Sequence, residues 1–167
     1  KPSSPPRSVA STRSCSASIL QSNGDAAWCM RPIILNAQRA LPVDTRRMTH
    51  LARRAIRRLR IRTRGTLEIT FVSAQRMRAL NRRFTRHDRV TDVLSFRYDG
   101  EPVVGEILIA PSEARAYALR HGLAYEEELS RYVVHGLLHW LGHDDRTQSQ
   151  QKRMRASEDR LLTQCAQ

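Results

Sequence analysis

The chain has 167 residues, of which 40% are apolar, and a formal net charge of +13. This length suits one domain, with or without a tail. No apolar run approaches the roughly 18 residues that a membrane-spanning helix needs, so we expect no membrane partner. The three cysteines show no ligand-like spacing, which excludes a disulfide framework and fits a reducing cytosol; they are Cys15, Cys29 and Cys165.

The positive charge is concentrated in one half of the sequence. Residues 31–89 contain seventeen arginines and three acidic residues, whereas residues 90–167 contain nine basic and twelve acidic residues. Such asymmetry suggests an anionic polymer as partner, because the planar guanidinium group binds phosphate through two parallel hydrogen bonds. The alternative is that the arginines are solvated side chains on helix surfaces, whose number reflects a GC-rich genome.

Residues 1–29 are rich in Ser, Pro and Ala and show no hydrophobic periodicity. This composition is typical of a disordered tail. The segment could also be a gene-model extension, with Met30 as the true start, or a transit peptide; we favour the first two interpretations. The folded domain is therefore expected over residues 30–167.

From Arg31 onward, strand-like and helix-like patterns alternate. Alternating apolar residues predict strands, and Asp, Thr or Ser before a helical pattern predicts a helix start. The first four expected elements are a strand at 32–37, a helix from Asp44 or Thr45 to about Leu59, a strand at 66–72, and a helix that follows Ser73 and runs to Arg83.

The second half of the sequence predicts a hairpin followed by helices. VLSF (93–96) and GEILIA (105–110) are expected to pair as strands across a connection that contains Gly100. Three helices follow, at 111–122, 126–142 and 148–163. The expected fold is a single α+β domain with a small mixed sheet of about four strands and about five helices.

Residues 135–145, HGLLHWLGHDD, suggest a metal site at the end of a buried helix. His135 and His139 are four residues apart and so lie on one helix face, about 6 Å apart along the axis. Gly142 allows a sharp turn, after which Asp145 can supply a third ligand. This is the metzincin spacing with Asp in the third place, and three protein ligands leave a fourth zinc position open. An isolated pair of packed histidines is the alternative.

Gly136 stands where metalloproteases of the H-E-x-x-H type have their catalytic glutamate. Without that carboxylate, a peptidase mechanism of this kind lacks its general base. A bound metal can still act as a Lewis acid or lower the pKa of a water molecule. We therefore expect Gly136 to serve close packing of the helix rather than proteolysis.

The sequence resembles the YbeY family of bacterial rRNA maturation endoribonucleases. HGLLHWLGHDD follows the family signature H-G-x-L-H-L-x-G-Y-D-H at most positions, and VTDVLSF (90–96) and GEILIA (105–110) match two further family blocks in the same order. The similarity extends from about Ile33 to Leu162. The resemblance implies a single α+β domain with one zinc ion, held by the motif positions His135, His139 and Asp145, that cleaves single-stranded RNA. It also implies a cytoplasmic role in 16S rRNA 3′-end maturation and ribosome quality control, with rRNA and the ribosome or its small subunit as partners and no small-molecule cofactor.

The sequence departs from the family pattern at two places. The third ligand of the family is usually histidine, whereas this chain has Asp145 in that register and His143 two residues earlier, as a lesser candidate. The family also has an arginine important for activity before the TDVLSF block. Thr85 occupies that register here, so Arg86 or Arg89 must supply the charge.

We assign the remaining roles as hypotheses. Arg86 and Arg89 neutralise charge that develops on the phosphodiester, and the arginine-rich face of residues 46–64 binds the RNA backbone. Ser95 could donate a hydrogen bond in the pocket, and His87 or Asp144 could transfer a proton. The runner-up function is a non-catalytic ribosome-assembly factor with a structural zinc. The arginines expected to contact RNA are Arg53, Arg54, Arg57 and Arg58.

Overall fold

The computed structural model describes residues 30–100 and 102–166, which form a four-stranded sheet and five helices. The expected α+β domain with a small mixed sheet is confirmed. The prediction of a disordered tail at residues 1–29 falls outside the described residues. The elements are β1 (Met30–Asn36), α1 (Thr45–Arg58), β2 (Gly65–Phe71), α2 (Ala74–Thr85), β3 (Val93–Arg97), β4 (Val103–Ile109), α3 (Pro111–His121), α4 (Tyr125–Trp140) and α5 (Gln148–Ala166).

The sheet has the strand order β1-β2-β4-β3. β1 pairs with β2 and β2 with β4 in parallel, whereas β3 pairs antiparallel with β4, with Val93 opposite Ile109. The hairpin predicted for the third and fourth strands is therefore confirmed. Because β4 lies between β2 and β3, the short β3 is an edge strand beside the helix that carries the histidines.

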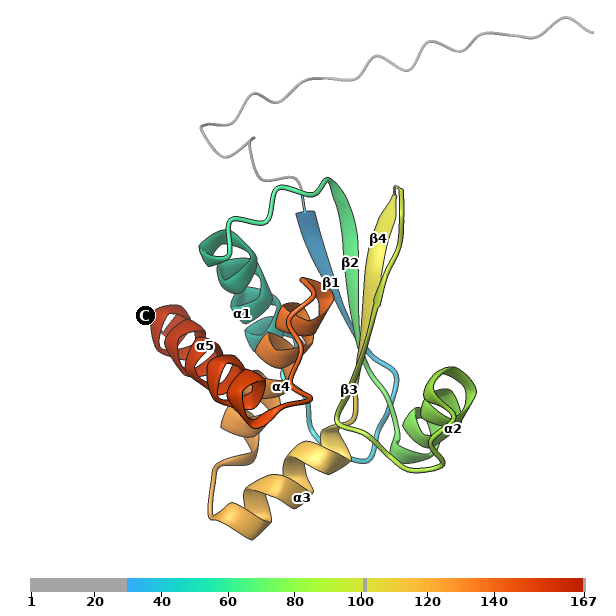
Figure 1. The fold of residues 1–167 in the computed structure, drawn as a ribbon. Helices are drawn as coiled ribbons and strands as arrows, with labels where there is room; N and C mark the ends of the chain where they lie inside the picture. The colour runs from blue at the N-terminus through green and yellow to red at the C-terminus, as the bar shows by residue number, and fades with distance from the viewer. Residues whose placement is uncertain (1–29, 101, 167) are drawn as a thin grey trace, which may run out of the picture.

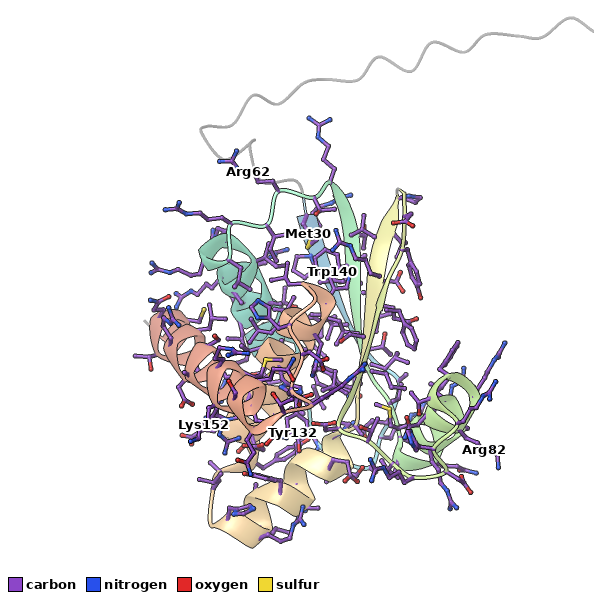
Figure 2. The ribbon with its side chains drawn as sticks, in the orientation of Figure 1. Met30, Arg62, Arg82, Tyr132, Trp140 and Lys152 are labelled. Atoms are coloured by element: carbon purple, nitrogen blue, oxygen red, sulfur yellow. The ribbon has the colours of Figure 1, made fainter. Side chains whose placement is uncertain are left out.

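Helices α1, α4 and α5 lie on one side of the sheet and α2 on the other (Figure 1). Helix α4 is the central helix, because it packs against β3, β4, α1, α3 and α5. Its side chains Val133, Val134 and Leu137 are fully buried, and Trp140 lies between the helix and the sheet (Figure 2). A helix with this environment holds its side chains in fixed directions, which suits a site built on it.

Helix α1 begins as its sequence predicts, since the Asp44 carboxylate accepts a hydrogen bond from the Arg47 backbone N–H at 2.9 Å. Its buried stripe includes Met48 and Ala55. Ala52 and Ile56 are buried, whereas Leu51 and Leu59 are only partly buried, near α5. The helix therefore packs against both the sheet and the C-terminal helix.

Gly136 allows α4 to approach the sheet closely. A Cβ atom at this position would lie 2.5 Å from Ile107 Cγ2 and 3.1 Å from Val93 Cγ1. The Ser95 hydroxyl, on the same strand as Val93, donates a hydrogen bond to the Gly136 carbonyl at 3.0 Å. Ser95 thus fastens β3 to the histidine-bearing helix.

Candidate metal centre

Helix α4 brings the two motif histidines together on one face. The rings of His135 and His139 have centroids 4.4 Å apart at an interplanar angle of 86°, and their Nε2 atoms are 2.9 Å apart. Their side chains are 15% and 26% exposed, so both rings are largely buried but reach the surface. The four-residue spacing therefore places both Nε2 atoms at one point.

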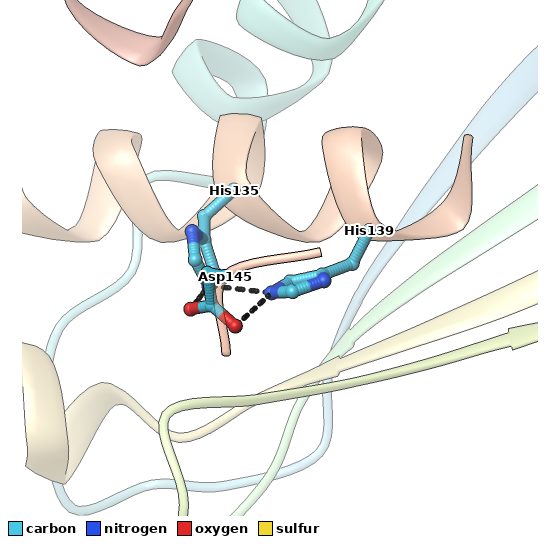
Figure 3. A group of neighbouring side chains, drawn as sticks. All are labelled: His135, His139 and Asp145. Carbon is cyan, nitrogen blue, oxygen red and sulfur yellow. Dashed lines mark hydrogen bonds and ion pairs between the residues drawn. The ribbon is translucent and has the colours of Figure 1, made fainter. Parts of the chain in front are cut away.

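Asp145 completes the group from the turn that follows the helix. Gly142 adopts a φ of +94°, a conformation that glycine reaches without steric cost, and the chain reverses there. The carboxylate then lies 3.9 Å from His135 Nε2 and 3.8 Å from His139 Nε2 (Figure 3). One ligand atom from each of the three residues lies within 4.8 Å of the others.

The Nδ1 atom of each ring faces a group that only accepts hydrogen bonds. His135 Nδ1 lies 2.7 Å from Glu158 Oε1, and His139 Nδ1 lies 2.9 Å from the His143 carbonyl oxygen. These partners assign the hydrogen to Nδ1 in both rings, so a neutral ring presents a lone pair at Nε2. Two lone pairs 2.9 Å apart repel each other, so this arrangement favours a proton or a cation between them. The three side chains therefore form a potential metal-binding triad whose donor atoms fit a divalent cation.

The surroundings divide the proton affinity of the two rings unequally. Burial lowers the pKa of His135, but the hydrogen bond to Glu158 and the nearby carboxylates raise it by more, so this pKa lies above its ordinary value. Burial, together with the neighbouring His135, lowers the pKa of His139. His135 therefore has the higher proton affinity of the two rings, and binding of a cation at its Nε2 competes with protonation.

Glu158 and Arg131 are site residues that the sequence reasoning missed. Glu158 is only 3% exposed on α5, where it lies in line with the buried Met154 and Leu161. Its second oxygen accepts a hydrogen bond from Arg131 Nη1 at 3.1 Å. The signal that could have revealed it is a carboxylate on the apolar stripe of an amphipathic helix, because burial of an unpaired charge is costly.

The other polar residues of the motif contribute to the turn rather than to the triad. His143 contributes its backbone carbonyl to His139, and its ring is not part of the triad. Asp144 accepts a hydrogen bond from the Asp145 backbone N–H at 2.9 Å and pairs with Arg146 at 3.2 Å. The geometry thus favours Asp145 over His143 as the third donor.

The loop between α2 and β3 is fixed by a hydrogen bond and an ion pair, although its arginines are exposed to solvent. The buried Asn81 side chain donates to the Arg89 carbonyl at 2.9 Å, and Asp88 pairs with Arg78 at 2.9 Å. Arg86 ends α2 in the left-handed conformation, with a φ of 64°. Within the described residues, neither Arg86 nor Arg89 makes a side-chain hydrogen bond or ion pair to the triad.

The loop histidine proposed as a proton carrier is exposed. His87 Nδ1 lies 3.1 Å from the Thr85 hydroxyl, which in turn donates to Asn81. These contacts assign His87 to the local loop structure. They do not place its ring against the histidines of α4.

The four arginines of α1 differ in their surroundings. Arg53, Arg57 and Arg58 are exposed. Arg54 is half-buried, and its Nη1 donates to the Cys165 carbonyl at 2.8 Å, which joins α1 to the end of α5. A hollow of about 520 Å³ beside them is lined by Arg54, Arg57, Arg58 and Gln164.

The family model described as "Endoribonuclease YbeY" matches residues 33–166. The chain belongs to the endoribonuclease YbeY family. The resemblance seen in the sequence motifs is therefore confirmed, and it covers almost all of the described residues. No helix among those residues has the length and apolar character needed to span a membrane.

Curated relatives from several bacteria carry the same name. The chain is 38% identical over 103 residues to "Endoribonuclease YbeY" of Myxococcus xanthus, which covers 58% of this chain and 35% of that protein. The sequence identity to the Chlorobium phaeovibrioides protein is 37% over 98 residues, which cover 58% of this chain and 66% of the relative. The sequence identity to the Koribacter versatilis protein is 45% over 83 residues, which cover 48% of this chain and 53% of the relative. The chain thus matches less than two thirds of the length of each of these relatives.

A solved structure supports the fold. The solution structure of TM1509 from Thermotoga maritima superposes with a TM-score of 0.57 at 26% sequence identity, over 80% of this chain and 88% of the other. The shared fold therefore extends beyond the segments aligned with the curated relatives.

Proposed function

We propose that this protein is a zinc-dependent endoribonuclease that cleaves single-stranded RNA. The observation that carries the proposal is the triad itself: two imidazole Nε2 atoms and one carboxylate converge, and both Nδ1 atoms face acceptors. Membership of the endoribonuclease YbeY family supports the choice of RNA as substrate.

Zinc is the proposed cation because of the chemistry of the donors. Two imidazoles and one carboxylate form a ligand set found in catalytic zinc sites, which keep a fourth position for water or substrate. When bound there, the ion supplies a Lewis acid for a phosphate oxygen and lowers the pKa of a coordinated water. His135, His139 and Asp145 would hold it, and the open position argues against a purely structural zinc.

The residues around the triad support RNA hydrolysis over peptide hydrolysis. Gly136 offers no carboxylate to act as a general base, and the space beside it is filled by Ile107 and Val93. The exposed Arg86 and Arg89 are proposed to neutralise charge that develops on the phosphodiester in the transition state. Their loop is pinned through Asn81 and Asp88, which restricts where the two guanidinium groups can reach.

The exposed arginines of α1 are the proposed contact to the RNA backbone. Arg53, Arg57 and Arg58 can each neutralise a phosphate without reading base identity. Arg54 is proposed to contribute as well, although its internal hydrogen bond to the Cys165 carbonyl limits its freedom. We infer that RNA binding by this surface depends strongly on salt.

The biological role proposed for the protein follows the family. We infer action on rRNA in the cytoplasm, in 16S rRNA 3′-end maturation and ribosome quality control, with the ribosome or its small subunit as partner. Residues 30–167 would suffice for the catalytic domain, and residues 1–29 would add nothing to catalysis.

The test of the proposed function is a cleavage assay with zinc analysis on the same preparation. Wild-type protein loaded with zinc should cut single-stranded RNA internally, and His139→Ala should lose both zinc and cleavage. A protein that binds zinc and RNA but leaves the RNA intact would overturn the nuclease proposal and favour an assembly factor with a structural zinc. A casein digest checks the absence of protease activity.

A further inference from the structure

A buried ionic group lies directly behind one of the two histidines. Glu158 on α5 is 3% exposed, and its two oxygens have different partners: Oε1 lies 2.7 Å from His135 Nδ1, and Oε2 lies 3.1 Å from Arg131 Nη1. Both oxygens of the carboxylate are therefore engaged. Because the position continues the apolar stripe of α5, an apolar side chain would pack there without any desolvation cost.

Arg131 forms the ion pair that compensates the charge of the Glu158 carboxylate. Its guanidinium contacts Glu158, Asp159 at 2.7 Å and Glu128 at 3.7 Å. One oxygen of Glu158 faces the His135 ring and the other faces the Arg131 guanidinium, and both contacts favour the ionised form of the carboxylate. The buried Glu128 also contacts this guanidinium and helps to fix the position from which it orients Glu158, whereas Asp159 is 57% exposed, so water can replace its contact.

The two histidines of the triad thus receive unequal support. His139 has a neutral backbone carbonyl at Nδ1, whereas His135 has a charged carboxylate at the shorter distance. An anionic acceptor at Nδ1 fixes the tautomer and ring orientation and makes the opposite nitrogen a more basic donor. Loss of such a partner typically weakens metal binding about 10- to 100-fold.

We propose that Glu158, oriented by Arg131, is a positioning residue that strengthens metal binding through His135. This inference rests on the metal centre of the proposed function. It differs from a packing role, because a packing residue would affect the stability of the metal-free fold without changing the affinity for a metal.

The experiment measures zinc affinity by competition with a chelator, together with thermal unfolding of the metal-free protein. Glu158→Gln keeps the length and one acceptor oxygen but removes the charge, whereas Glu158→Ala removes both. Asp159→Asn is the matched control, since it alters the neighbouring carboxylate, which shares Arg131 but does not contact His135.

We expect Glu158→Ala to weaken zinc binding about 10- to 100-fold, Glu158→Gln to lie between it and wild type, and Asp159→Asn to match wild type. Partial recovery by Gln marks positioning, and the Gln variant keeps the proposal testable if the Ala variant fails to fold. Equal zinc affinity of wild type, Glu158→Gln and Asp159→Asn would overturn this inference alone. Zinc binding without RNA cleavage by wild type would overturn the nuclease proposal and leave this one standing.

Discussion

The triad on α4 and the arginines of α1 present polar groups in opposite ways. Both ring nitrogens of His135 and His139 have defined partners, and both rings are largely buried. Arg53, Arg57 and Arg58 are exposed, and what they offer a ligand is their positive charge. A buried, fully partnered group acts through its geometry, whereas an exposed arginine acts through an attraction that salt screens.

The loop that carries Arg86 and Arg89 lies between these extremes. Its backbone is held by Asn81 and by the ion pair of Asp88 with Arg78, while its two arginines extend into solvent. Such an arrangement would suit arginines that contact a substrate from a loop whose backbone is fixed. It also ranks the expected effects of substitution, from the triad through the loop to α1.

The largest effect is expected for the triad. Removing the hydrogen-bond partner of a metal ligand typically lowers metal affinity about 10- to 100-fold. His139→Ala should lower zinc affinity by more than this, because it removes a donor atom itself. Zinc at a hundred times its Kd should stabilise wild type by about 2.7 kcal/mol and leave the variant unchanged. Calorimetric unfolding with and without zinc measures both.

His143→Ala is the matched control for that variant. It removes an imidazole four residues away but keeps the backbone carbonyl that accepts from His139. The control should bind zinc like wild type. If His143→Ala loses zinc while Asp145→Ala retains it, the third donor is His143 and the assignment to Asp145 is wrong.

A smaller effect is expected for the loop arginines, and it should fall on turnover. Removing one preorganised charge donor from a transition state typically costs about 10²- to 10³-fold in kcat. Arg86→Gln should approach the lower end of this range, because Arg89 can replace part of the charge, and RNA affinity should change little. Single-turnover cleavage and equilibrium binding separate the two quantities.

Arg82→Gln serves as the control for the loop, since this exposed arginine lies one turn earlier on α2. Its turnover should match wild type. A loss of binding without a loss of turnover in Arg86→Gln would assign Arg86 to the same class as the α1 arginines.

Substitutions on the α1 surface should change RNA affinity and its salt dependence only. Replacing Arg53, Arg57 and Arg58 together by Gln should weaken binding of all single-stranded RNAs alike. The log–log salt dependence should become flatter by about 0.7 for every phosphate that the variant no longer neutralises. Zinc content should not change. Arg54 is left intact because its hydrogen bond to Cys165 joins two helices, and its removal would mix stability with binding.

The control is an equal change in charge at exposed arginines of the acidic half, Arg115, Arg153 and Arg160. If both triple variants change the salt dependence equally, net charge rather than the α1 surface attracts RNA. If neither does, the arginines of α1 are solvated side chains without a binding role.

The smallest effect is expected at the start of the chain. A protein that begins at Met30 should unfold at the same temperature as the full chain and cleave RNA at the same rate. The reason is that β1 begins at Met30 and completes the sheet with the described residues alone. A lower unfolding temperature would show that residues 1–29 contribute to the folded domain.

The local features of this protein were determined by its sequence. Periodicity placed all four strands and five helices within a few residues, and the Asp44 and Ser73 caps lie where expected. The triad could also be predicted from the sequence, because His135, His139 and Asp145 lie within eleven residues. The helix repeat and the glycine turn determine their relative positions.

Only the tertiary structure decided which distant groups meet. Glu158 is 23 residues from His135, and Arg54 is 111 residues from Cys165. A hydrophobic pattern shows which face of a helix is buried but not which element covers it, so neither the strand order β1-β2-β4-β3 nor the carboxylate behind His135 could be read from spacing. The ligands of the candidate centre are local in sequence, whereas the groups that orient them come from the packing of α5 on α4.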